Sequence, residues 1–118
     1  MKTTDVGRAA EQKAAEYLSQ AGHEVIETNW RTRWCEIDLI TRANNVVHIV
    51  EVKYRRSACS GDGFAAITPL KRSRLVRAAQ AWTQYYGYSG SYQIDVIALR
   101  GDVSDPEITI AENISADW

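Results

Sequence analysis

Apolar and polar residues follow two different periods along this chain, and the periods separate helices from strands. Between residues 5 and 21, apolar side chains recur every three or four positions. This spacing predicts an amphipathic helix that is capped by Thr4 or Asp5 and ended by Gly22. Three shorter apolar runs follow, each with the length of a strand, and they cover residues 25–30, 35–41 and 46–53.

The second half of the chain returns to a helical period and then to strands. Thr68 before Pro69 is typical of a helix start, and Gly87 is typical of a helix end. Two further runs predict a fourth strand and a short fifth strand at an edge, residues 91–99 and 107–110. The order α-β-β-β-α-β-(β) predicts an α/β fold with a mixed sheet flanked by helices.

The Asn44-Asn45 pair sets the register of the second and third predicted strands. If these residues are the centre of a two-residue hairpin turn, Asp38 lies opposite Glu51 and Glu36 lies opposite Lys53. A loop with an odd number of residues would instead send Asp38 and Glu51 to opposite faces of the sheet.

Two opposed carboxylates on neighbouring strands have two interpretations. Their Cβ atoms would lie about 4.5–5.5 Å apart, so the charges of Asp38 and Glu51 would repel each other. A divalent cation such as Mg²⁺ removes this repulsion, and Lys53, on the same face as Glu51, would point at the same site. The alternative is a buried ion-pair network that also includes Glu36.

Basic residues gather around the proposed site. The second predicted helix has a buried stripe of Leu75, Ala79, Trp82 and Tyr86, and Lys71 extends this stripe by one turn toward the sheet. Its first turn offers phosphates an anion site formed by Lys71, Arg72 and Arg74, although lysines on amphipathic helices also extend into solvent. Four more arginines flank the site, namely Arg31, Arg33, Arg55 and Arg56.

Other residues near the site have less specific patterns. Trp30 and Trp34 stack on bases or pack in the core or a dimer interface, and we favour packing. His23 and His48 look isolated, and His48 alternates to the face opposite Glu51. The segment 57–63 is a loop that closes over nucleic acid or is simply a mobile surface loop.

Composition fits one globular domain that covers residues 1–118. The chain is 45% hydrophobic and 25% charged, which excludes disordered, collagenous and membrane classes. It lacks both an apolar run of about 18 residues and a signal peptide. We therefore expect a cytoplasmic protein without membrane contact, in which Cys35 and Cys59 are reduced thiols.

The net charge of −1 conceals an uneven distribution. Residues 53–77 carry seven bases and one acid, a net charge of +6, whereas residues 78–118 carry a net charge of −5. The acidic C-terminal segment, 101–118, is expected to be peripheral to the domain. The near-neutral total therefore does not exclude nucleic acid as a partner, and it predicts salt-sensitive binding through a local patch.

The motifs together resemble a known family. Ile37-Asp38 followed by Glu51-Val52-Lys53 resembles the PD-(D/E)xK signature of restriction-endonuclease-like nucleases. The chain is similar over residues 7–99 to the YraN family, bacterial proteins similar to archaeal Holliday junction resolvases. Five ordered motifs carry this resemblance: Asn29-x-Arg31, Glu36-Ile37-Asp38-Leu39-Ile40, Val50-Glu51-Val52-Lys53-x-Arg55, Lys71-x-x-Arg74-Leu75 and Asp95-Val96-Ile97.

The resemblance implies a restriction-endonuclease-like fold and metal-dependent hydrolysis of phosphodiester bonds. Asp38 and Glu51 would bind Mg²⁺ or Mn²⁺ with the carbonyl of Val52, and Lys53 would position the attacking water. Glu11 matches an additional acid on the first helix, although an exposed helix glutamate is the simpler interpretation.

Three functions follow as expectations. The first is a nuclease that cuts DNA of particular shape, such as branched or junction DNA, as a homodimer. The second is a nucleic-acid-binding module that keeps the nuclease fold without cutting. The third is a structural or partner-binding protein whose acids form a buried ion network.

Overall fold

The secondary structure follows the predicted order. The computed structural model describes residues 3–56 and 67–114, so the loop predicted at 57–63 lies outside the described residues. The elements are α1 (Thr3–Gln20), β1 (Glu24–Arg31), β2 (Glu36–Ala43), β3 (Val46–Arg55), α2 (Pro69–Tyr86), β4 (Tyr92–Arg100) and β5 (Glu107–Ala111). The first helix begins at Thr3, ahead of both predicted caps, and the observed strands match the predicted ones to within two residues.

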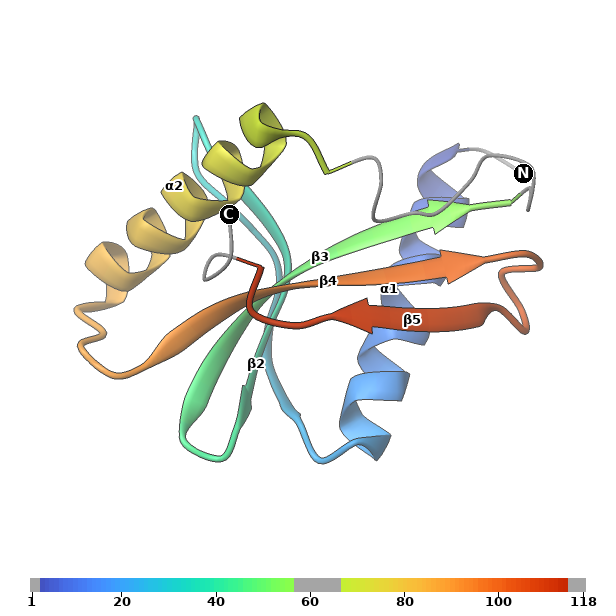
Figure 1. The fold of residues 1–118 in the computed structure, drawn as a ribbon, viewed down its shortest axis with the longest axis horizontal. Helices are drawn as coiled ribbons and strands as arrows, with labels where there is room; N and C mark the ends of the chain where they lie inside the picture. The colour runs from blue at the N-terminus through green and yellow to red at the C-terminus, as the bar shows by residue number, and fades with distance from the viewer. Residues whose placement is uncertain (1–2, 57–66, 115–118) are drawn as a thin grey trace.

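The five strands form one mixed sheet in the order β1-β2-β3-β4-β5 (Figure 1). Neighbouring strands are antiparallel except for β3 and β4, which are parallel. A parallel pair needs a long crossover connection, and α2 lies in the connection between these two strands. The short β5 is at the edge of the sheet.

Each helix covers its own hydrophobic cluster on the sheet. Residues of α1 pack with Val50 of β3 and with Ile97 and Leu99 of β4. Residues of α2 pack instead with Ile49 of β3 and with Ile94 and Val96 of β4. Because successive side chains of a strand point to opposite faces, the two helices cover opposite faces of the sheet, and α1 runs behind the strands in Figure 1.

The Asn44-Asn45 turn fixes the predicted register. Both residues have positive φ, 53° and 64°, as a type I′ hairpin turn requires. The β2–β3 pairing runs from Ala43 opposite Val46 to Leu39 opposite Val50. The predicted register is therefore confirmed up to the residue pair before Asp38 and Glu51.

The caps of α2 confirm its predicted ends. Thr68 Oγ1 accepts a hydrogen bond from Lys71 N at 3.1 Å, and Gly87 ends the helix with φ 64°. The prediction that Tyr86 belongs to the buried stripe is wrong, because its side chain is 53% exposed. Its hydroxyl donates a hydrogen bond to Glu27 instead, which holds the ring at the surface. Among the described residues, no helix is long and apolar enough to cross a membrane.

Candidate functional site

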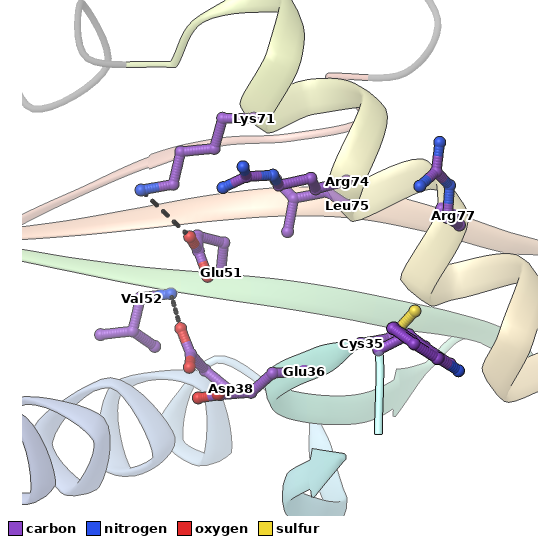
Figure 2. A pocket seen from close by; sticks show the side chains of 10 residues that line it. Cys35, Glu36, Asp38, Glu51, Val52, Lys71, Arg74, Leu75 and Arg77 are labelled. Atoms are coloured by element: carbon purple, nitrogen blue, oxygen red, sulfur yellow. Dashed lines mark hydrogen bonds and ion pairs between the residues drawn. The ribbon is translucent and has the colours of Figure 1, made fainter. Parts of the chain in front are cut away.

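Asp38 and Glu51 come together where the β2–β3 ladder ends. Asp38 immediately precedes Leu39, the last residue of β2 that pairs with β3, and its Oδ2 accepts a hydrogen bond from the backbone N–H of Val52 at 2.8 Å (Figure 2). The carboxylate thus takes the place of a backbone acceptor between the two strands.

The environment of Asp38 opposes its ionisation. Burial raises its pKa, and the adjacent carboxyl of Glu51 raises it further, to about 7. The Val52 N–H and the Lys71 ammonium act in the opposite direction without cancelling the effect. The repulsion between two carboxylates that the register predicts is therefore present in the folded chain.

The backbone of Val52 adds an oxygen to this site. In an extended strand, the N–H and C=O of one residue point to the same side, because paired residues exchange both bonds. Since the Val52 N–H points to Asp38, the Val52 carbonyl also points toward β2. Two carboxylates and one carbonyl thus lie near the same end of the hairpin.

Two lysines lie on the other side of Glu51. Lys71, in the first turn of α2, has its Nζ 3.6 Å from Glu51 Oε2, which confirms that this lysine emerges beside the sheet. Lys53 is only 5% exposed. Burial lowers the pKa of Lys53 to about 8, and the neighbouring Lys71 and Arg55 lower it as well. Lys53 is therefore a buried amine near Glu51 and Lys71, and it is not among the residues that line the cleft described below.

Glu11, on α1, lies near Asp38 but is not among the residues that line the cleft described below. Burial raises the pKa of its half-buried carboxyl, as do the nearby Asp38 and Glu36, whereas a hydrogen bond with Asn29 and the charge of Arg31 lower it. Asn29 has φ 51°, a left-handed conformation that asparagine tolerates, within strand β1. Sequence patterns assign no role to Asn29, although it belongs to one of the five motifs.

The oxygen donors of Asp38, Glu51 and Val52 fit Mg²⁺ better than they fit a metal ion that needs three or four side-chain ligands. Within residues 3–56 and 67–114, no group of three or more His, Cys, Asp and Glu side chains could hold a metal ion. Mg²⁺ commonly uses one or two carboxylates and keeps several waters. Asp38, Glu51 and the Val52 carbonyl match that donor set.

These residues line a cleft of about 680 Å³ between the hairpin and α2 (Figure 2). Its lining consists of Trp34, Cys35, Glu36, Asp38, Glu51, Val52, Lys71, Arg74, Leu75 and Arg77. Figure 2 shows the basic side chains on α2 across from the acids of the strands. Arg77 was not predicted, although Lys71, Arg74 and Arg77 recur every three residues and hence follow one side of the helix.

The other predicted basic residues lie outside the lining of this cleft. Arg31, Arg33 and Arg56 are exposed, and Arg72 is half-buried on α2. Arg55 donates a hydrogen bond to the backbone carbonyl of Tyr54 at 3.0 Å. The cleft therefore gathers Lys71 and Arg74 from the predicted set but not the four arginines that flank the motifs.

The two tryptophans differ in their surroundings. Trp30 is buried in the hydrophobic cluster under α2, as favoured from the sequence. The prediction that Trp34 packs in the core is wrong, because its side chain is 82% exposed at the mouth of the cleft. The reason is that Trp34 lies in the turn after β1, where strand alternation no longer fixes its direction.

The prediction that His23 and His48 are isolated is also wrong. Their ring centroids lie 4.6 Å apart, and His23 Nδ1 lies 2.7 Å from Thr41 Oγ1. His48 Nδ1 donates a hydrogen bond to Asp95 Oδ2 at 2.6 Å. Parallel pairing of β3 with β4 brings Asp95 next to His48, and the turn after α1 brings His23 onto them.

Comparison with known proteins identifies the family. The model of "Uncharacterised protein family UPF0102" matches residues 10–99, a span that contains the described acids and cleft bases. A UPF0102 protein of Herpetosiphon aurantiacus is 38% identical and covers 95% of this chain and 94% of its own length. Relatives of the same description from Leifsonia xyli and Colwellia psychrerythraea are 39% and 36% identical, covering 91% and 94% of this chain and 92% and 88% of their own. The chain therefore belongs to the UPF0102 family, the YraN family that its five motifs resemble.

Proposed function

We propose that this protein is a Mg²⁺-dependent nuclease that hydrolyses phosphodiester bonds in DNA. The observation that carries the proposal is the pairing of Asp38 with Glu51 across a cleft from Lys71, Arg74 and Arg77. A site for a simple anion would not place two acids at its floor. A divalent cation would match the acids on the strands, and a phosphodiester would match the basic residues of α2 on the other side of the cleft.

Three groups of the chain would hold the cation: the carboxylates of Asp38 and Glu51 and the carbonyl of Val52. A bound Mg²⁺ would supply Lewis acidity toward a phosphate oxygen and would lower the pKa of a water bound to it. Glu11 on α1 is near enough to Asp38 for that carboxyl to raise its pKa, so the Glu11 carboxylate would accept a hydrogen bond from a water at the edge of this site.

The basic residues would bind and orient the substrate. Lys71 and Arg74 would contact phosphate oxygens on one side of the scissile bond, and Arg77 would contact the neighbouring phosphate. Lys53 would hold the attacking water, because its buried ammonium lies near Glu51 and Lys71. Positive charge fixed at this position stabilises the negative charge that develops on the phosphate in the transition state.

The catalytic assignment predicts a sharp loss of activity in two single variants. Glu51→Gln and Lys53→Met should each lower cleavage of branched, flapped or linear DNA with Mg²⁺ by roughly 100-fold or more. Glu107→Gln is the matched control, because this exposed glutamate forms an ion pair with Arg100 at the edge of the sheet, outside the cleft lining. Cleavage rates from labelled oligonucleotides measure the effect.

Two outcomes would contradict the proposal. Activity that survives in Glu51→Gln and Lys53→Met would remove these residues from the mechanism. A wild-type protein that binds the same DNA substrates but cuts none of them would instead be the non-catalytic nucleic-acid-binding module.

The cleft bases predict a second, separate effect on binding. Arg74→Gln and Arg77→Gln should each reduce the slope of log K against log salt by about one, because each removes one phosphate contact. Arg42→Gln, a change at an exposed arginine on β2 outside the cleft lining, should leave the slope unchanged. Fluorescence anisotropy of labelled DNA over a salt series measures the slopes, and equal slopes in all variants would contradict the assignment.

A further inference from the structure

We propose that Trp34 is a stacking platform for an unpaired base, so that the substrate is DNA with an unpaired nucleotide next to the cleaved bond. This inference rests on the proposed nuclease function and adds a substrate class to it. It names Trp34 as a positioning residue, because its ring would hold the base while other groups act on the phosphate.

The first support is the exposure of the ring beside the candidate site. At 82%, Trp34 has the largest exposed fraction of the large hydrophobic side chains in the described part of the chain. It lines the same cleft as Asp38, Glu51 and the α2 bases. Large aromatic side chains are usually buried, so a tryptophan displayed at the mouth of a polar cleft indicates a flat apolar ligand.

The second support is the rigidity of the turn that carries Trp34. Thr32 Oγ1 accepts hydrogen bonds from Trp34 N at 3.1 Å and from Cys35 N at 3.0 Å. Thr32 N donates a hydrogen bond to the carbonyl of Cys35 at 2.8 Å. These bonds close the turn between β1 and β2, so that binding a base would order little additional chain.

The third support is the charge around the ring. The guanidinium of Arg33 lies 5.2 Å from the centroid of the Trp34 ring, which is within the range of a cation–π interaction. The two next most exposed aromatic rings have aromatic neighbours instead: Tyr85 packs edge-on against Trp30, and Tyr86 packs against Trp82. Trp34 thus combines a flat ring with a cation and with the basic wall of the cleft, which is the combination that binds single strands.

Stacking on Trp34 selects against intact duplex. In a continuous duplex, both faces of each base are covered by neighbouring bases, so a protein ring gains access only to a base that is unpaired or flipped out. The phosphate of such a nucleotide would remain beside Lys71 and Arg74. Nucleotides at gaps, flaps and branch points meet this requirement, whereas fully paired linear DNA does not.

The experiment compares binding of two oligonucleotides in EDTA, so that cleavage does not occur. One is a continuous duplex, and the other is the same duplex with one unpaired 2-aminopurine, whose fluorescence is quenched on stacking. Trp34→Leu keeps apolar bulk but removes the aromatic face, whereas Trp34→Phe keeps an aromatic face. Tyr85→Leu is the control for loss of an exposed aromatic ring outside the cleft lining.

Trp34→Leu should lose roughly 10-fold in affinity for the unpaired substrate and lose the quenching, with duplex affinity unchanged. Trp34→Phe should retain most of both, and Tyr85→Leu should match the wild type. Unchanged preference and quenching in Trp34→Leu, or an equal loss on both oligonucleotides, would overturn the platform while leaving the nuclease assignment standing. Absence of binding to either DNA by the wild type would overturn the platform, whereas the cleavage assay with Mg²⁺ tests the nuclease assignment separately.

Discussion

Asp38→Asn should stabilise the metal-free protein at pH 8 by about 1–3 kcal/mol, even though it removes a residue of the candidate site. In the folded chain, burial and the Glu51 carboxyl hold the pKa of Asp38 at about 7, above its ordinary value of 3.8. The unfolded chain therefore releases this proton first as the pH rises. Stability is full below about pH 4 and falls as the pH rises toward 7, so the wild type carries this penalty at pH 8.

The asparagine variant avoids the penalty because its side chain is neutral at every pH. Its amide oxygen can still accept the hydrogen bond that Val52 N donates to Asp38, so the end of the hairpin keeps its geometry. Urea unfolding in EDTA at pH 4 and pH 8 measures the difference, which should be present only at pH 8. Asp102→Asn is the matched control, since hydrogen bonds from Ser104 lower the pKa of Asp102 and the same change there should not stabilise.

The same variant separates a metal site from a structural ion network. If the acids exist to bind a cation, Asp38→Asn should also abolish the Mn²⁺ binding that calorimetry detects in the wild type. A stability gain together with a binding loss is typical of residues that are strained for function. If Asp38 and Glu51 instead form a stabilising network with the lysines, Asp38→Asn should lower stability at pH 8, and that result would contradict the metal site.

The candidate acid pair could be predicted because its determinants are local. Asn44 and Asn45 favour positive φ, this fixes a two-residue turn, and the turn fixes the register of the strands on both sides. In this register Asp38 lies opposite Glu51, and the alternation of side chains along each strand puts both carboxylates on the same face of the sheet. The position of Lys71 could also be predicted locally, because this residue lies one turn before the buried stripe of α2. Its ion pair with Glu51 confirms that the side chain emerges beside the sheet.

The sequence patterns were insufficient where position depends on contacts between distant segments. The pairing of β3 with β4 runs through a crossover that contains α2, and no turn sets its register, so the contact between His48 and Asp95 has no local signal. The prediction that Trp34 packs in the core is wrong for a different reason. It lies between strands, where neither the helical nor the strand period indicates whether a side chain is buried.

The buried network around Asp95 contributes to the stability of the sheet rather than to the cleft. The side chain of Asp95 is 0% exposed. It accepts hydrogen bonds from His48 Nδ1, Gln93 Nε2 and Asn113 N at 2.6, 2.8 and 2.9 Å. These donors come from β3, from β4 itself and from the segment after β5. Asp95 therefore connects three parts of the chain that the sequence order separates.

Asp95→Ala should lower the free energy of unfolding by about 3–5 kcal/mol, because it leaves the buried donors of His48 and Asn113 without their acceptor. Urea unfolding followed by circular dichroism measures the loss, with Asp105→Ala as the control at an exposed aspartate. Asp95→Asn keeps one oxygen acceptor, so it should lose less and remain measurable if the alanine variant does not fold. A loss below about 1 kcal/mol in both variants would show that the network is dispensable, and the junction of β3, β4 and the C-terminal segment would then depend on apolar packing alone.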